Sequence, residues 1–101
     1  MPDSLDSRVI FAVGAGTPDH RALVVALAEA GADVVVAGPH GLSYEVLLNS
    51  ISNEVWALGR RSTVIAFDAT SARSFADALT RAQSDLGRVD FVVRVEGVAH
   101  A

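Results

Sequence analysis

The stretch from Arg8 to Gly38 is the part of the chain that most constrains its fold. The apolar run Val9–Val13 predicts a buried strand, and the glycines of Gly14–Gly16 predict a turn directly after it. A largely apolar segment, Pro18–Ala30, then predicts a helix packed between layers. The next run, Ala32–Ala37, is continuously apolar rather than alternating, as expected for a strand buried on both faces of a parallel sheet. The stretch therefore predicts a βαβ unit.

The turn after the first strand is a suitable position for a phosphate group. In a βαβ unit this turn lies at the carboxyl end of the sheet, beside the N-terminus of the next helix, where free N–H groups and the helix dipole favour an anion. Thr17 is suited to cap that helix, and Pro18 suits its first position. The sequence therefore predicts where a nucleotide would bind, at the turn that contains Gly14 and Gly16.

The rest of the chain repeats the same alternation of strands and helices. Helices are predicted over residues 42–58 and 72–86, and strands over residues 63–67 and 90–95. With right-handed crossovers, this order predicts an α/β, Rossmann-like three-layer fold, in which a four-stranded parallel sheet of order 3-2-1-4 carries three helices. The helix over residues 42–58 is expected to bury the stripe Tyr44, Leu47, Leu48, Ile51, Val55 and Leu58.

One small domain accounts for the whole chain of 101 residues. Residues 1–7 are interpreted as a polar N-terminal lead-in, and residues 8–101 as a single truncated Rossmann-like domain. In the predicted sheet order the third helix lies alone on its face, which leaves that face and the edge of the fourth strand poorly covered. A protein partner or self-association through these surfaces is therefore expected, and Trp56 is either a core-edge residue or an interface anchor.

Composition excludes several classes of function. A net charge of −4 argues against nucleic-acid binding. The eight basic residues are all Arg, so lysine-dependent chemistry is excluded within this chain, and the absence of Cys excludes thiolate sites. His20, His40 and His100 have no recognised metal-ligand spacing, so no metal site is predicted. The N-terminus lacks the pattern of a signal peptide and no apolar stretch could span a bilayer, so a cytoplasmic protein without membrane insertion is expected.

Three blocks of the sequence resemble the first part of a short-chain dehydrogenase/reductase. They are VGAGTPDHRALVVALAEAGADVVVAG, EVWALGRRSTVIAFDATSARSF and LGRVDFVVRVEGVA, and they stand in the family's order and spacing. Together they extend the resemblance over nearly all of residues 8–98. The resemblance implies that the chain is the N-terminal Rossmann half of such a protein, and that its glycine turn binds NAD or NADP.

The resemblance also implies which residues bind the cofactor, in a degenerate form of the family's motif. In the Gly-x-x-x-Gly-x-Gly turn, Gly14 matches the first glycine, whereas the second and third positions are Pro18 and His20. Pro18 lacks an N–H, and the ring of His20 stands where the family keeps the backbone bare for the pyrophosphate. The residues implied to bind the cofactor are Gly14, Gly16, Thr17, His20, Asp68, Ala69 and Gly97.

Parts of the implied cofactor site stay open in the sequence. Gly38, Pro39 and His40, which follow the second strand, give no preference between NAD and NADP. Asp68 matches the family's Asp near the adenine, but it is also placed to cap the third helix. Arg94 stands in the segment that replaces the family's Asn-Asn-Ala-Gly, where it is interpreted as a solvated strand end.

The family's catalytic pair has no counterpart in this chain. Its Tyr-x-x-x-Lys motif needs a lysine, and the only Tyr, Tyr44, is expected on the apolar stripe of a helix. We therefore expect a non-catalytic module that acts in assembly or as an accessory subunit. Two alternatives remain: the NAD(P)-binding portion of an oxidoreductase whose catalytic half is missing or supplied elsewhere, and a nucleotide-sensing binding protein.

Overall fold

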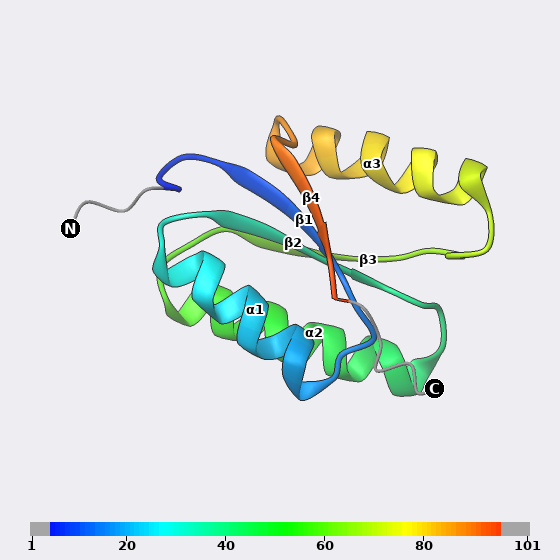
Figure 1. Cartoon of the computed structure of the whole chain (residues 1–101), viewed down its shortest axis with the longest axis horizontal. Helices are drawn as coiled ribbons and strands as arrows, with labels where there is room; N and C mark the ends of the chain where they lie inside the picture. The colour runs from blue at the N-terminus through cyan, green and yellow to red at the C-terminus, as the bar shows by residue number, and fades with distance from the viewer. Residues whose placement is uncertain (1–4, 96–101) are drawn as a thin grey trace.

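The chain folds into alternating strands and helices around one parallel sheet (Figure 1). The computed structural model describes residues 5–95. The elements in chain order are β1 (Val9–Val13), α1 (Pro18–Glu29), β2 (Asp33–Gly38), α2 (Leu42–Ala57), β3 (Ser62–Ala66), α3 (Ala72–Leu86) and β4 (Phe91–Arg94). All three strand pairs are parallel and the sheet order is β3-β2-β1-β4, which confirms the predicted Rossmann-like topology.

The helices cover the two faces of the sheet unequally. Figure 1 shows α1 and α2 on one face of the sheet and α3 on the other. Side chains alternate along β1, so that Ile10 and Ala12 face α1 and α2, whereas Val9, Phe11 and Val13 face α3. All five residues are buried, because β1 is an inner strand with helices on both faces. The predicted three-layer arrangement is therefore confirmed.

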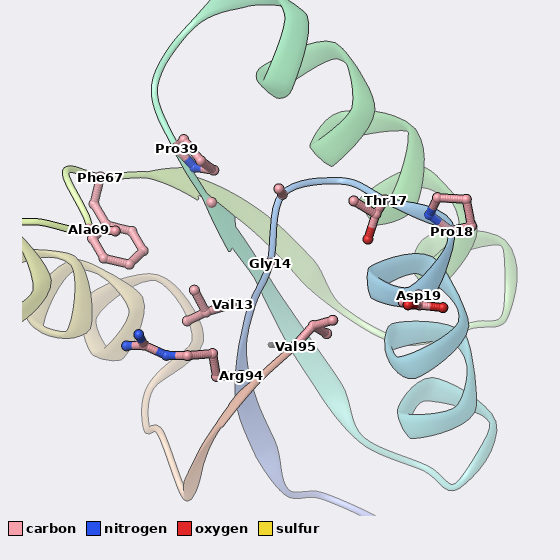
Figure 2. A pocket seen from close by; sticks show the side chains of 12 residues that line it. Val13, Gly14, Thr17, Pro18, Asp19, Pro39, Phe67, Ala69, Arg94 and Val95 are labelled. Atoms are coloured by element: carbon pink, nitrogen blue, oxygen red, sulfur yellow. The ribbon is translucent and has the colours of Figure 1, made fainter. Parts of the chain in front are cut away.

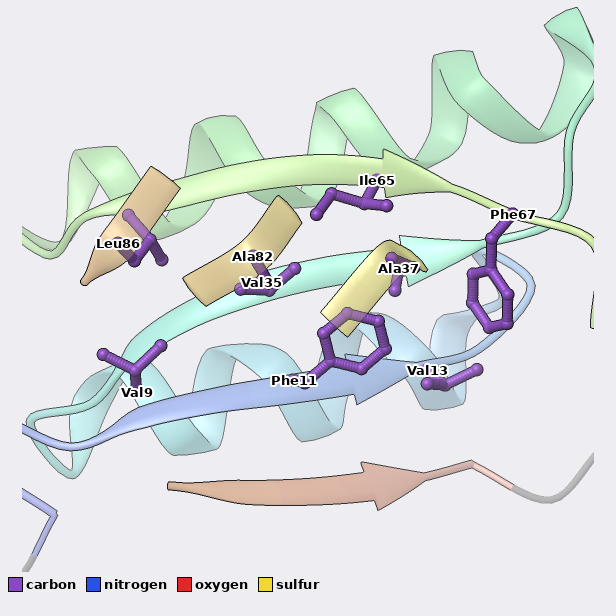
Figure 3. Packing of buried hydrophobic residues seen from close by; sticks show 10 residues of the cluster. Val9, Phe11, Val13, Val35, Ala37, Ile65, Phe67, Ala82 and Leu86 are labelled. Atoms are coloured by element: carbon purple, nitrogen blue, oxygen red, sulfur yellow. The ribbon is translucent and has the colours of Figure 1, made fainter. Parts of the chain in front are cut away.

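Three aromatic rings form the centre of the core beneath α3. The ring centroid of Phe11 on β1 lies 6.1 Å from that of Phe67 and 5.8 Å from that of Phe75 on α3, and the Phe67 and Phe75 centroids are 5.7 Å apart. Figure 3 shows Phe11 and Phe67 among the side chains that project from the sheet toward α3. Contacts between tilted or perpendicular rings stabilise a core beyond simple burial. The rings hold the first half of α3 over the carboxyl end of the sheet.

The buried face of α2 is narrower than the sequence predicts. The buried residues of this helix are Leu48, Ile51, Ser52 and Val55. The prediction that Tyr44, Leu47 and Leu58 are buried is wrong, since each is 40 to 43% exposed. Because α2 packs on β2 and β3 at the outer side of α1, one side of the helix suffices to cover them. Trp56 is 56% exposed and therefore does not belong to the edge of the core.

Strand β4 forms an open edge of the sheet. Within the described part of the chain it pairs only with β1. Phe91 and Val92 are 51% and 45% exposed, whereas the side chains of β1 are buried. The fourth strand is therefore as poorly covered as its sequence position suggests. No helix within residues 5–95 has the length and apolar character needed to cross a membrane.

Candidate nucleotide-binding site

The turn after β1 lies directly against the end of β2. The N–H of Gly14 donates a hydrogen bond to the carbonyl of Ala37 at 2.9 Å. A Cβ atom at Gly38 would lie 2.4 Å from the carbonyl oxygen of Gly14, and a Cβ atom at Gly14 would lie 2.4 Å from Cγ of His20. Neither position has room for a side chain, so both glycines are required where the two strands and α1 meet.

The first turn of α1 is capped as the sequence predicts. Thr17 is the N-cap, and its Oγ1 accepts a hydrogen bond from the N–H of His20 at 3.2 Å. Pro18 occupies the first helical position, where the missing N–H removes no hydrogen bond from the helix. Asp19 adds a carboxylate to the first turn, and this charge interacts favourably with the positive end of the helix dipole.

The ring of His20 lies beneath the turn and is fully buried. Its Nδ1 accepts a hydrogen bond from the N–H of Gly16 at 3.0 Å, and its Nε2 lies 3.1 Å from the carbonyl oxygen of Ala12. With Nδ1 as the acceptor, the ring carries its proton on Nε2, which donates to Ala12. Burial lowers the pKa of His20 from its ordinary value, and the bond to Ala12 opposes this shift in part. The ring therefore lies between the turn and β1, and it does not line the cavity described below.

A cavity of about 610 Å³ opens at the carboxyl ends of the strands (Figure 2). The glycine turn and the start of α1 form one side, and the segments that follow β2, β3 and β4 form the others. The lining residues are Val13, Gly14, Ala15, Thr17, Pro18, Asp19, Gly38, Pro39, Phe67, Ala69, Arg94 and Val95. The chain reverses its direction of sheet growth between β1 and β4, and open parallel sheets bind ligands at such switch points.

The sequence-predicted cofactor residues lie in several different places around this cavity. Three of them line it, namely Gly14, Thr17 and Ala69. Gly16 is buried and lines a second hollow on the outer side of α1 and α2, whereas His20 lies beneath the turn. Asp68 is exposed and does not line the cavity. Gly97 lies outside the described residues.

Asp68 orders the loop that follows β3. Its Oδ1 accepts hydrogen bonds from the hydroxyl of Thr70 at 2.6 Å and from the N–H of Thr70 at 2.9 Å. These bonds, the hydroxyl first, lower the pKa of Asp68, and the nearby His40 contributes in the same direction. The N-cap of α3 is Ser71, whose Oγ accepts a hydrogen bond from the N–H of Ser74 at 3.1 Å. Asp68 therefore does not cap α3.

Sequence reasoning missed two charged side chains that line the cavity. Figure 2 shows Arg94, at the end of β4, and Asp19, in the first turn of α1, on opposite sides of the cavity. Arg94 is exposed at the end of β4, as its interpretation as a solvated strand end predicts, and it also lines the cavity. Its position at the carboxyl end of a parallel strand, next to the switch in strand order, is the signal that points to it.

Backbone N–H groups at the turn are available to an anion. Those without a hydrogen-bond acceptor among the described residues belong to Ala15, Thr17 and Asp19, all of which line the cavity. The N–H groups of Gly14 and Gly16 are bonded within the protein, and Pro18 has none. A phosphate at this position would meet free donors and the positive end of α1. In the part of the chain that the structure describes, no group of His, Asp and Glu side chains is placed to hold a metal ion.

Proteins with a similar sequence and fold are dehydrogenases. No family model matches the chain. It is 31% identical over 105 residues to a (−)-trans-carveol dehydrogenase from Rhodococcus erythropolis, a match that covers 94% of this chain and 37% of the relative. The structure of a short-chain type dehydrogenase/reductase from Mycobacterium marinum matches with a TM-score of 0.78 and 26% identity, covering 90% of this chain and 35% of that one. In sequence and in fold, this chain is similar to the N-terminal Rossmann part of short-chain dehydrogenases/reductases.

The shared region is only part of the related proteins. A further curated relative is an L-rhamnose 1-dehydrogenase (NAD(P)(+)) from a Sphingomonas species. It is 28% identical over 94 residues, which cover 93% of this chain and 36% of the relative. The chain thus spans little more than a third of the length of the curated relatives it matches. The resemblance predicted from the three sequence blocks is confirmed.

Proposed function

We propose that this chain is a non-catalytic Rossmann module that binds NAD or NADP in the cavity at the glycine turn. The observation that carries the proposal is the cavity of about 610 Å³ bounded by Gly14 and Thr17 at the switch in strand order. The unbonded N–H groups of the turn supply donors for a pyrophosphate. The name of the related L-rhamnose 1-dehydrogenase includes NAD(P)(+), which supports the same class of ligand here.

The residues around the cavity fit the parts of a dinucleotide. Gly14 lines the cavity without a side chain of its own, and Arg94 supplies a positive charge for a phosphate group. Phe67 and Ala69 offer apolar surface for a base. The chain itself thus provides both the polar and the apolar contacts that such a ligand needs.

Three features are expected to lower the affinity of this site for a pyrophosphate. Pro18 has no N–H, the N–H of Gly16 is bonded to His20, and the carboxylate of Asp19 lines the cavity. A carboxylate next to a phosphate costs binding free energy because both groups are negatively charged. We therefore expect binding in the micromolar range rather than tighter.

We assign cofactor binding to these residues, and no catalytic step. A bound nicotinamide supplies the hydride in this family, but the proton that accompanies it needs an acid or base. The chain has no Lys, and its only Tyr, Tyr44, lies on the exposed side of α2, away from the cavity lining. The catalytic half would therefore come from another segment of polypeptide.

Titration with NADH and NADPH tests the proposal, with nicotinamide fluorescence and thermal stability followed together. Binding is expected to raise the fluorescence and to raise the melting temperature with ligand concentration. Arg94→Ala is expected to weaken binding by about tenfold, because one charge-assisted contact is lost. Arg73→Ala, which removes an exposed Arg of α3 outside the cavity, is the matched control and is expected to change nothing. A lack of response by both probes to both dinucleotides would overturn the proposal.

A second candidate function, assembly with another protein or with a second copy, is favoured by the open edge of the sheet. Phe91 and Val92 of β4 are about half exposed, and β4 has a pairing partner on one side only within the described residues. Edge strands with exposed apolar side chains are templates for pairing. Sedimentation tests this candidate, because a stable and well-folded monomer at all concentrations would remove its support.

A further inference from the structure

The buried ring of His20 connects the glycine turn to β1. Its Nδ1 accepts the N–H of Gly16 at 3.0 Å, and its Nε2 donates to the carbonyl of Ala12 at 3.1 Å. No part of the residue is exposed, and a Cβ atom at Gly14 would come within 2.4 Å of the ring. Two hydrogen bonds and the contact with the turn therefore hold the ring, and no solvent is in reach to replace either bond.

Only one protonation state of the ring satisfies both hydrogen bonds. The N–H of Gly16 points at Nδ1, so Nδ1 must keep its lone pair, and the carbonyl of Ala12 needs a proton on Nε2. A charged imidazolium carries a proton on each nitrogen. Protonation would therefore set an N–H against the N–H of Gly16 in a buried site, and it would break the bond to the turn while leaving the bond to β1.

The charged groups around this site do not stabilise a charged ring. On α1 itself the flanking residues are Asp19, which lines the cavity, and Arg21, which pairs with Glu54 of α2. The charged residue at the end of β4 is Arg94, and β1 and the turn carry no titratable side chain beside the ring. None of these groups contributes to the lowered pKa of His20, which is caused by burial and opposed in part by the bond to Ala12.

We propose that neutral His20 is a positioning residue for the glycine turn, and that protonation of its ring releases the turn. Through its two hydrogen bonds the side chain fixes where Gly16 lies relative to β1. The release of the turn stands on the geometry of the ring. Its effect on nucleotide affinity rests in addition on the proposed function.

The direction of the pH dependence follows from the burial of the ring. Burial lowers the pKa of His20 in the folded protein, whereas a ring released to solvent titrates near its ordinary pKa of about 6.5. The released state thus binds a proton more tightly, so the turn is held above about pH 6.5 and is released progressively below it. Asp68 and Asp90 have lowered pKa values and titrate at more acidic pH, outside this window.

Nitrogen-15 NMR of the wild-type chain tests the two halves of the proposal. At pH 7.5 the ring shifts of His20 are expected to show a neutral ring with its proton on Nε2. Between about pH 7.5 and 5.5 the protection factor of the Gly16 amide, corrected for intrinsic exchange, is expected to fall by about tenfold. A charged ring at pH 7.5, a proton on Nδ1, or protection that does not change with pH would overturn the proposal.

Two glutamine variants distinguish titration of the ring from a structural role. His20→Gln retains an acceptor and a donor on one planar group but has no charge to gain, so protection of the Gly16 amide is expected to become independent of pH. His40→Gln, which changes an exposed His, is expected to leave the pH dependence as it is in the wild type. Retention of the wild-type pH dependence in His20→Gln would overturn the proposal. If that variant does not fold, the wild-type ring shifts and amide protection still decide.

Calorimetric titration with NAD⁺ and NADP⁺ at pH 7.5 and 6.0 separates this inference from the proposed function. The wild type is expected to bind more tightly at pH 7.5, and His20→Gln is expected to bind equally at both values. Protection of Gly16 that depends on pH, without any binding, would overturn the nucleotide site and leave the role of His20 supported. Binding without pH-dependent protection would overturn the role of His20 and leave the nucleotide site supported.

Discussion

Asp90 joins the starts of two neighbouring strands at the end of the sheet away from the cavity. Its Oδ2 accepts the N–H of Val9 at 2.8 Å, its Oδ1 accepts Nη2 of Arg88 at 2.6 Å, and Arg8 lies 3.9 Å away. The bond from Val9 first, and then Arg88, lower the pKa of Asp90. The carboxylate is thus stabilised in its charged form, and it links β1 to β4 by a side chain in addition to the strand pairing.

Asp90→Asn is expected to lower the melting temperature at pH 7 by a few degrees, because the amide lacks the charge that attracts Arg88. Since the folded-state pKa of Asp90 lies below its unfolded value, its contribution is present above about pH 4 and is lost as the pH falls further. The variant should therefore lose less stability than the wild type between neutral pH and pH 3. Thermal melts across this range measure both effects. Asp77→Asn, on the exposed side of α3, is the control, and an unchanged melting temperature of Asp90→Asn at pH 7 would contradict the expectation.

A second feature at the scale of residues is the contact between Gly14 and His20. The ring of His20 fills the space that a side chain at Gly14 would need. Gly14→Ala puts a Cβ 2.4 Å from the buried ring, and overpacking of this kind is expected to lower the free energy of unfolding by about 1–3 kcal/mol. In the background of His20→Gly, the same Gly14→Ala change should cost much less. Urea unfolding of the two single variants and the double variant measures this coupling. Additive losses would show that the ring is not what excludes a side chain at Gly14.

At the scale of elements, a buried pair of hydroxyls fixes α2 on the sheet. Ser52 of α2 and Ser62 of β3 lie 2.7 Å apart between their Oγ atoms, and both residues are buried. Ser62→Ala is expected to lower the free energy of unfolding by about 1–3 kcal/mol, because it leaves the hydroxyl of Ser52 without a partner. Ser52→Ala together with Ser62→Ala should recover much of the loss. Denaturant unfolding of the three variants checks this, and a double variant less stable than both singles would contradict it.

The sequence predicts the elements well and the exposed side of α2 poorly. Apolar runs such as Val9–Val13 and punctuating glycines are local signals, so strand and helix positions follow from them to within one or two residues. Burial on α2 depends on which strands the helix crosses. Leu47 and Tyr44 satisfy the helical period, yet both are exposed, and Leu47 lines the hollow beside Gly16 and α1. Periodicity gives the hydrophobic side of a helix but not how much of it is covered.

The same difference between local and non-local information applies to the candidate site. Gly14 and Thr17 are adjacent to a strand end and a helix start, so sequence spacing finds them. The burial of His20 depends on hydrogen bonds to Ala12 and Gly16 that no spacing rule describes. Arg94 reaches the cavity only because β4 pairs with β1, a contact across about 80 residues of sequence.

At the scale of the whole molecule, the sheet is asymmetric about β1. The β2 and β3 side is covered by α2 on one face and α3 on the other, whereas the β4 side ends in a strand with exposed apolar residues. The cavity lies at this boundary, since Arg94 and Val95 close it from the β4 side. Any protein that covers the edge of β4 would therefore lie next to the candidate nucleotide site.

Val92→Lys is expected to reduce self-association if the edge of β4 is the contact between copies of this chain. The side chain of Val92 is 45% exposed, so a lysine there can reach water without disturbing the core, while its charge opposes the burial of the edge. Val46→Lys introduces the same charge at a 58% exposed Val of α2 and is the matched control. Sedimentation velocity over a range of concentrations measures the association of the wild type and both variants. Equal weakening by the two lysines would mean that net charge, and not the edge of β4, governs association; weakening by Val92→Lys only would place the contact at the strand that borders the cavity.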